Sequence, residues 1–263
     1  MNLKDTQNEP DDRQLPIDRV GVKNLRYPIR VRDRAHGGQE TVATVKLTVD
    51  LPHHFKGTHM SRFLEVLHAH GPMLHVDNIG DMLDALTSKL DSDCAHVEFT
   101  FPYFIEKSAP VTGARGMVDY EVCFEATIEG GRRDFVLSVV VPVTTLCPCS
   151  RAISDRGAHN QRGQVTLRVR FSKPVWIEDL VGLVEASASS ELYSVLKRPD
   201  EKAVTERAYD NPVFVEDLVR NVSLKCRTHP DITWHSVEAE NFESIHNHNA
   251  YALIEYPTFK AQL

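Results

Sequence analysis

The order of secondary structure read from the sequence repeats once along the chain, and this repeat constrains the fold more than any other feature. Alternating apolar residues predict strands, and apolar residues at helical spacing predict helices. The first half is expected to form strands at 19–32 and 40–51, helices at 61–69 and 79–90, and strands at 95–105 and 116–128. The second half is expected to form strands at 134–144 and 163–171, helices at 177–186 and from Asn211-Pro212 through Val222, and strands at 231–239 and 249–256. The order strand-strand-helix-helix-strand-strand, read twice, predicts either two tandem α+β modules or one generic α+β domain with long hairpins.

The polar segment 1–18 precedes this repeat and is expected to be a mobile N-terminal arm. The two modules are then expected at 19–130 and 131–263, and the second carries most of the candidate site residues. The arm has no apolar run and so does not read as a signal peptide. The most apolar later stretch, 136–143, is far shorter than the roughly 20 residues that cross a bilayer. We therefore expect a soluble, cytoplasmic protein.

The charge of the chain limits its partners. With a formal net charge of −7 at pH 7, the protein is not expected to bind nucleic acid or membrane surfaces broadly. An anionic small molecule would need a local basic pocket. The five cysteines are an odd number in a chain with a well-sized core, which disfavours a disulfide framework. Cys94, Cys123 and Cys226 read as isolated buried thiols, whereas Cys147 and Cys149 flank a proline.

The segment 143–162 leaves an apolar strand and forms a long polar connection before the next strand. A connection of this length in a compact domain usually has a function. Cys147 and His159 within it are ligand types that zinc and related metals use. Their spacing matches no zinc finger, so an open catalytic site fits better than a closed structural one. The alternative is a buried thiol with an unrelated surface histidine.

Two histidines stand at the entrance to the last expected strand. His246 and His248 are two residues apart and face the same side of an extended backbone. They suit a metal ligand beside a general acid, or two proton-transfer groups. A pair of exposed loop histidines is the alternative.

Three further candidates are open to a structural interpretation as well. Glu201 lies in a polar connection, where a free surface carboxylate is the default. Glu216 lies in the first turns of a helix, where its charge suits the helix dipole, although it could instead accept hydrogen bonds from a guanine. The segment 56–62 leads into the first helix, where backbone N–H groups and nearby cationic and hydroxyl side chains could hold phosphate.

Taken together, these motifs resemble the type IB GTP cyclohydrolase family. The matching segments are 56–62 (Lys-Gly-Thr-His-Met-Ser-Arg), 146–150 (Leu-Cys-Pro-Cys-Ser), 157–162 (Gly-Ala-His-Asn-Gln-Arg), 211–217 (Asn-Pro-Val-Phe-Val-Glu-Asp) and 244–248 (Ser-Ile-His-Asn-His). The resemblance implies a tunnelling fold of two ββααββ modules, with antiparallel sheets and helices on one face. It also implies a homotetramer with active sites between subunits, and a divalent metal ion that is zinc, manganese or iron.

The implied reaction is hydrolysis of GTP to formate and 7,8-dihydroneopterin triphosphate, the first step of tetrahydrofolate synthesis. The resemblance assigns roles residue by residue. Metal ligands are Cys147, His159 and Glu201; acid/base candidates are His248 and His246; Glu216 anchors guanine; Lys56, Thr58, Ser61 and Arg62 are phosphate-side candidates.

Two rival hypotheses use the same cysteines differently. Another tunnelling-fold enzyme acting on a pterin or deazapurine, such as a nitrile reductase, would use Cys147 as a nucleophile. A non-catalytic metal or redox sensor would use Cys147 together with Cys149.

Overall fold

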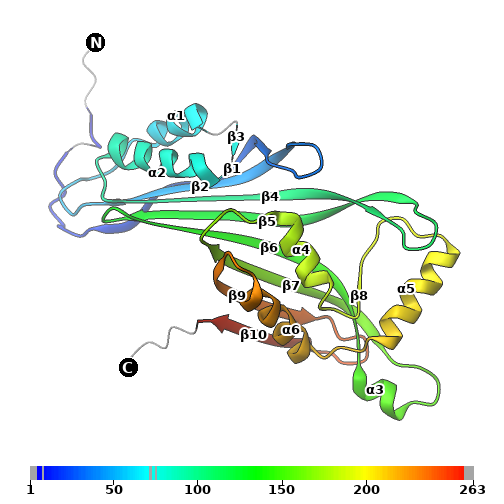
Figure 1. Cartoon of the computed structure of the whole chain (residues 1–263). Coiled ribbons are helices and arrows are strands. Elements are labelled where there is room, and N and C mark those ends of the chain that lie inside the picture. The colour runs from blue at the N-terminus through cyan, green and yellow to red at the C-terminus, as the bar shows by residue number, and fades with distance from the viewer. Residues whose placement is uncertain (1–4, 8, 71–72, 75, 258–263) are drawn as a thin grey trace. The chain divides into compact units, whose positions relative to one another are not determined.

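The computed structural model describes residues 5–7, 9–70, 73–74 and 76–257. In this part of the chain the backbone forms ten strands and six helices (Figure 1). The strands are β1 (Ile17–Val31), β2 (Gln39–Leu51), β3 (Met73–Leu74), β4 (Cys94–Ser108), β5 (Arg115–Glu129), β6 (Arg132–Leu146), β7 (Asn160–Phe171), β8 (Ser190–Glu191), β9 (Ile232–Asn241) and β10 (Ala250–Tyr256). The helices are α1 (Met60–His70), α2 (Val76–Leu90), α3 (Pro148–Ile153), α4 (Ile177–Glu185), α5 (Arg198–Asp210) and α6 (Val215–Thr228).

The expected repeat is confirmed by the order of the principal elements. The first module consists of β1, β2, α1, α2, β4 and β5, and the second of β6, β7, α4, α6, β9 and β10. The chain also forms two compact units. The first runs to Pro102 and includes Cys123–Val136, and the second comprises Tyr103–Val122 and the chain from Leu137 onward. These units divide the chain differently from the repeat, because β4, β5 and β6 each contribute a part to both.

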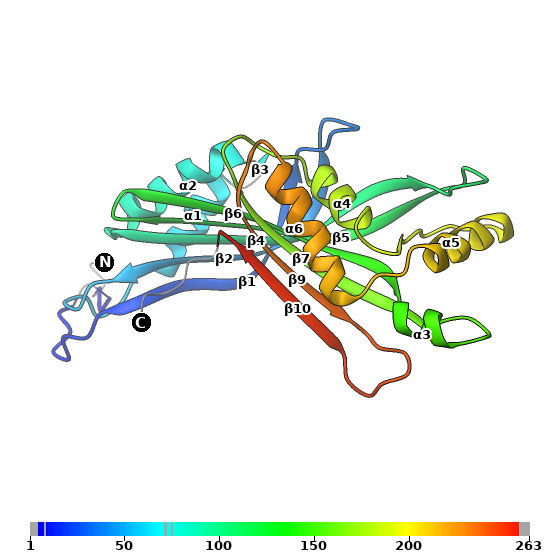
Figure 2. The same cartoon turned by 60° about the horizontal axis from the view of Figure 1, so that its bottom comes forward.

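The first unit is a sheet with two helices on one face (Figure 2). Its strand order is β3-β1-β2-β4, followed by the parts of β5 and β6 that belong to the unit, and the β1–β2 and β2–β4 pairs are antiparallel. Along β2, Val45, Leu47 and Val49 are buried in alternation, which places them on one face of the sheet. Phe63 of α1 and Leu83 of α2 are also buried, so the helices and this face share one core.

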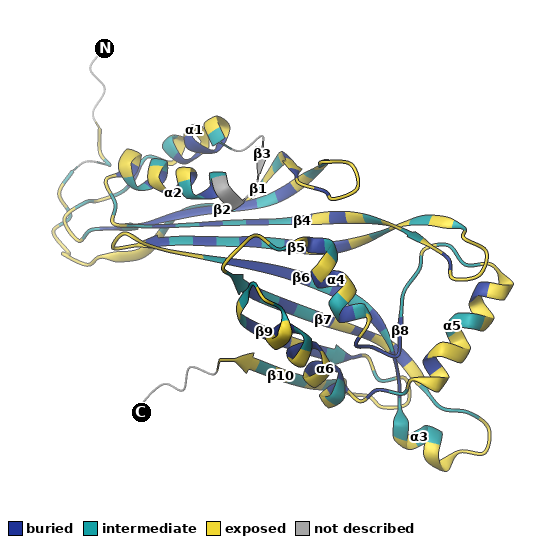
Figure 3. Ribbon diagram, in the orientation of Figure 1, coloured by how far each residue is buried: buried dark blue, intermediate teal, exposed yellow. Residues whose placement is uncertain are grey.

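The second unit has the strand order β4-β5-β6-β7-β9-β10, with β8 paired to β6. The ladders β6–β7, β7–β9 and β9–β10 are antiparallel. Helix α6 packs on β9 and β10, and α4 packs on β7 and α6. Buried and intermediate side chains alternate along the strands and appear as bands along β4 in Figure 3. No helix among the described residues is long and apolar enough to cross a membrane.

Helix α5 differs from the prediction, which places Glu201 in a polar connection. Only Asp200 and Ala208 are buried in this helix, so no apolar stripe marks it in the sequence. The helix is instead held at its first turn. Asp200 is fully buried and accepts hydrogen bonds from the backbone N–H groups of Val111 and Thr112, both at 2.9 Å, and from Lys197.

The expected start of α6 at Asn211-Pro212 was wrong. Asn211 is the C-cap of α5, and its side chain donates to the carbonyl oxygen of Ala188 at 2.8 Å. Phe214 has extended backbone angles, so α6 begins at Val215. Pro212 lies one residue beyond the end of α5, where proline is common because it cannot continue a helix. The short helix α3 also interrupts the connection that was expected to be irregular.

Candidate active site

The connection between β6 and β7 brings its two ends together. Leu146 and Asn160 are partners in the β6–β7 ladder, so Cys147 and His159 both stand at the base of the loop. The backbone N–H of Cys147 donates to the carbonyl oxygen of His159 at 3.1 Å. Ser150, in the first turn of α3, donates its N–H to the Cys147 sulfur at 3.5 Å. Although the two candidate ligands are twelve positions apart in sequence, the hairpin therefore places them side by side.

A chain of hydrogen bonds orients the His159 ring. Gln161 donates its side-chain N–H to the buried Thr145 hydroxyl at 3.0 Å, so its amide oxygen is the atom that lies 3.0 Å from His159 Nδ1. An amide oxygen only accepts, so Nδ1 carries the hydrogen in this arrangement. The lone pair of the neutral ring is then on Nε2, which is the nitrogen available to a metal or a proton.

The start of α6 forms an apolar wall beside this loop. The N–H of Val213 donates to the carbonyl oxygen of Leu146 at 3.1 Å, which fixes the segment next to Cys147. Val213 and Val215 are buried, whereas Phe214 between them is exposed. Glu216 follows in the first helical turn, with its side chain exposed.

The β9–β10 connection supplies the remaining wall. The rings of His246 and His248 are stacked with centroids 5.1 Å apart, which confirms that the two side chains face the same side. Glu243 stands earlier in the same connection, and its carboxylate lies 3.9 Å from His159 Nδ1. The side chains of His159 and Glu243 are 13% and 12% exposed, so this pair is largely shielded from water.

These three segments enclose one cavity of about 260 Å³, entirely within the second unit. Its volume is near the lower end of the roughly 300–1,000 Å³ of small-molecule sites. Five of the candidate residues line it: Cys147, His159, Glu216, His246 and His248. Three polar residues that the sequence analysis did not assign also line it: Gln161, Asn241 and Glu243. Gln161 and Glu243 lie within or beside motifs already singled out, whereas no sequence signal marks Asn241.

Glu201, the third candidate metal ligand, does not line this cavity. It lies on α5, directly after the buried Asp200, and its side chain is exposed. Within the described residues, no three His, Cys, Asp or Glu side chains gather closely enough to hold a metal ion.

The four phosphate-side candidates belong to the first unit, at and before the start of α1. Thr58 is buried, and Lys56, Ser61 and Arg62 are more exposed. The described part of the 1–18 segment contacts this region, since Glu9 pairs with Lys56 at 2.8 Å and Gln7 donates to the Thr58 carbonyl oxygen at 2.8 Å. The hydrogen bond and charge of Glu9 raise the pKa of Lys56.

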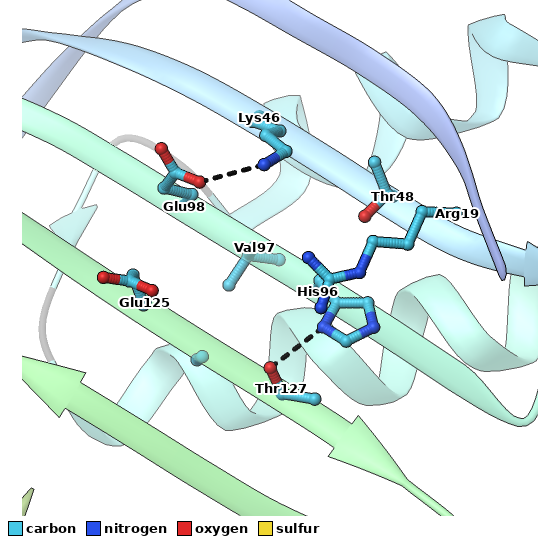
Figure 4. A pocket seen from close by; sticks show the side chains of 9 residues that line it. Arg19, Lys46, Thr48, His96, Val97, Glu98, Glu125 and Thr127 are labelled. Atoms are coloured by element: carbon cyan, nitrogen blue, oxygen red, sulfur yellow. Dashed lines mark hydrogen bonds and ion pairs between the residues drawn. The ribbon is translucent and has the colours of Figure 1, made fainter.

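A smaller cavity of about 70 Å³ lies on the first unit and is lined by none of the candidate residues (Figure 4). Two of its charged side chains pair with each other, Lys46 with Glu98 at 3.2 Å. His96 contacts the Thr127 hydroxyl at 3.0 Å, and burial together with the nearby Arg19 charge lowers the pKa of His96. The Thr48 hydroxyl is buried without a hydrogen-bond partner among the described residues.

Comparisons with known proteins agree on one family. Residues 3–252 match the family model described as "Type I GTP cyclohydrolase folE2". The chain is 62% identical over 258 residues to the GTP cyclohydrolase FolE2 of Akkermansia muciniphila, with 97% of this chain and 98% of the relative covered. It is 55% identical over 255 residues to the GTP cyclohydrolase FolE2 of Syntrophotalea carbinolica, with 97% and 96% covered.

Solved structures show the fold. The structure described as the highly active BTUO mutant P287G superposes with a TM-score of 0.54 at 8% identity, covering 90% of this chain and 98% of that one. The R298C mutant of the urate oxidase from Bacillus sp. TB-90 gives a TM-score of 0.53 at 9% identity, covering 90% and 97%. At this identity the likeness concerns architecture alone, and it confirms the expected α+β tunnelling fold with antiparallel strands.

Proposed function

Since the chain belongs to the FolE2 family of type I GTP cyclohydrolases, we propose that it opens the guanine ring of GTP in the cavity of the second unit. The products are formate and 7,8-dihydroneopterin triphosphate, and the reaction begins tetrahydrofolate synthesis. One observation carries the assignment of the site. Three segments far apart in sequence bring five independently singled-out residues to the same cavity. We further propose that the enzyme works in the cytoplasm, with GTP as its small-molecule partner.

Glu216 and Phe214 suit the guanine base. The Glu216 carboxylate is an acceptor for the ring N–H and the exocyclic amino group, which are donors on the same edge of guanine. Phe214 offers an exposed aromatic surface beside it, against which a flat base can stack. A cavity of about 260 Å³ accommodates the base and leaves the triphosphate to extend outward.

The stacked histidines are placed for proton transfer. Carbon 8 of guanine is a poor electrophile until a neighbouring ring nitrogen is protonated. His248 is the proposed acid that delivers this proton, and His246 shares the later transfers that accompany ring opening and loss of formate. A histidine pair suits this task because the unperturbed imidazole titrates near neutral pH.

Cys147 and His159 are the proposed metal ligands on this cavity. The donor set fits, because a thiolate and an imidazole nitrogen are ligands that zinc, manganese and iron sites use, and Gln161 leaves Nε2 of His159 available. When bound, a divalent ion supplies Lewis-acid activation for the addition of water to carbon 8. Glu201 is the proposed third ligand, although it lies exposed on α5 and does not line this cavity.

We propose that the active protein is a homotetramer with active sites between subunits. Under this proposal Lys56, Thr58, Ser61 and Arg62 of a neighbouring subunit meet the triphosphate. Lys56 would exchange its present partner Glu9 for a phosphate oxygen.

The test is turnover by the full-length protein. Chelator-treated protein is incubated with GTP and with zinc, manganese or iron(II) in turn, and formate and neopterin fluorescence are measured. Release of both products with at least one metal supports the proposal. No formate with any of the metals contradicts it. A separate assay tests the nitrile reductase alternative: formation of a covalent bond between Cys147 and a nitrile-bearing deazapurine would support it.

A further inference from the structure

Asn241 carries a buried acceptor that has no partner in the described structure. It is the last residue of β9, the residue is 3% exposed, and it lines the same cavity as Glu216 and His248. Its side-chain oxygen is one of the few buried polar atoms of the described residues that lack a hydrogen bond. A buried polar atom without a partner costs stability, and this oxygen belongs to a residue that lines a cavity, where a bound ligand or a water can donate to it.

The strand ladder holds the backbone of Asn241 in place. Asn241 is the register partner of Gly163 on β7 and of Ala250 on β10, so its backbone is fixed on both sides. A Cβ atom at Gly163 would lie 2.7 Å from the Asn241 oxygen and 3.3 Å from Val143. The missing side chain at Gly163 is therefore what makes room for the Asn241 amide.

We propose that Asn241 accepts a hydrogen bond from the bound nucleotide and is a substrate-positioning and specificity residue of this cavity. The proposal rests on the function proposed above. If Glu216 takes the ring N–H and one amino hydrogen, two kinds of donor on the nucleoside remain: the second amino hydrogen and the ribose hydroxyls. Both are N–H or O–H donors that a neutral amide oxygen accepts.

The first test replaces Asn241 with leucine, which is close in size and has no polar atom. GTP affinity of metal-free full-length protein is measured by calorimetry, and kcat/KM of metal-loaded protein by formate release. We expect Asn241→Leu to weaken GTP binding and kcat/KM at least tenfold while Tm stays the same or rises. A fall in Tm with parent-like GTP affinity would mean that the oxygen serves the fold, through a bound water, and would overturn the proposal.

Two nucleotides identify the donor. Inosine triphosphate lacks the amino group and 2′-deoxy-GTP lacks one ribose hydroxyl. The parent should bind at least one of them more weakly than GTP, and Asn241→Leu should reduce that difference for the nucleotide whose missing group Asn241 contacts. Glu216 would still contribute to discrimination against inosine triphosphate. If the variant keeps the parent's discrimination against both, Asn241 contacts neither group and the proposal is wrong.

Matched variants separate the effect of the atom from the effect of substitution. The Thr48 hydroxyl in the first unit is another buried polar group without a partner among the described residues. Thr48→Val removes it and should leave GTP affinity unchanged. Gly163→Ala displaces the Asn241 amide without altering it and should also weaken GTP binding, whereas Gly182→Ala has open space around it and should not. The parent's own formate release tests the proposed function. The GTP affinity of the metal-free variants relative to the parent tests the Asn241 proposal without depending on formate release, so either proposal can fail while the other holds.

Discussion

At the residue scale, the Thr145–Gln161–His159 chain makes a prediction about metal binding. Gln161→Met keeps the length of the side chain and removes the acceptor of the His159 ring hydrogen. Loss of such a partner typically weakens metal binding 10–100-fold. We expect a loss of this size, measured by competition with a chromophoric chelator, and an unchanged circular dichroism spectrum.

Gln164 is the matched control for this experiment. It lies on the same strand with an exposed side chain, and Gln164→Met should bind metal as the parent does. Equal metal affinity in the parent and in Gln161→Met would show that the ring orientation does not depend on the amide.

Glu216 makes the second prediction at this scale. Glu216→Gln keeps the shape of the side chain but places a donor opposite the donors of guanine. We expect the variant to fold, to retain its metal and to lose GTP affinity about tenfold or more, the equivalent of one lost hydrogen bond to a charged group. Inosine triphosphate lacks the amino group, so the variant should discriminate against it less than the parent does.

The next residue provides the control. Asp217 lies in the same helical turn and pairs with Arg220 at 3.3 Å, and it does not line the cavity. Asp217→Asn should leave GTP affinity unchanged. If Glu216→Gln changes only thermal stability, the carboxylate serves the helix dipole and not the substrate.

The residues of the site also differ in whether they could be predicted from the sequence. Cys147, His159, Glu216, His246 and His248 stand in compact motifs of chemically distinctive types, and the structure places all five on one cavity. Asn241 could not be found this way, because its role depends on the strand register that sets it opposite Gly163. Whether the five perform the roles assigned to them stays a prediction.

At the scale of elements, alternation predicted the long strands to within a few residues, because each buries one face. It failed for α5, which buries almost nothing, and for the start of α6, where Asn211 serves the preceding helix. Both errors concern segments that are fixed by individual hydrogen bonds and not by an apolar pattern.

The α5 attachment gives a prediction with a defined pH dependence. Burial alone would raise the pKa of Asp200, but hydrogen bonds from Thr112, Lys197 and Val111 outweigh it and lower the pKa. The carboxylate therefore contributes stability above its unfolded pKa of about 3.9, and this contribution is lost as the pH falls below that value. Asp200→Asn should lower Tm at pH 7 and speed amide exchange at Val111 and Thr112. Its Tm should also fall less than the parent's on acidification below about pH 4.

Asp210, at the exposed end of the same helix, is the control. Asp210→Asn should change neither Tm nor exchange at those two amides. Protected amides at 111 and 112 in Asp200→Asn would mean that the turn does not depend on the carboxylate.

At the scale of the whole molecule, the proposed assembly can be tested by mixing inactive variants. Cys147→Ala removes a group from the cavity of the second unit, and Arg62→Ala removes one from the first unit. If each active site combines these regions from two subunits, random mixed assemblies should recover about a quarter of the parent's activity. Formate release after co-refolding or co-expression measures the recovery.

A second mixture is the control. Cys147→Ala and His159→Ala affect the same cavity, so their mixture should stay inactive. Absence of recovery in the first mixture would place both groups in the site of a single chain, or remove Arg62 from the site.

Three strands, β4, β5 and β6, belong to both units, and this limits how the chain can be divided into fragments. In sequence the natural place to cut is the turn between β5 and β6, at Gly130 and Gly131. A fragment that begins there would keep β6 without its neighbour β5. Apart from the short pairing with β8 at Val143 and Thr144, the edge of β6 that β5 covers would then be unpaired beside the buried Val139 and Val141. Long, apolar, exposed edges pair with other strands. Such a fragment should therefore aggregate or dimerise instead of remaining a soluble monomer.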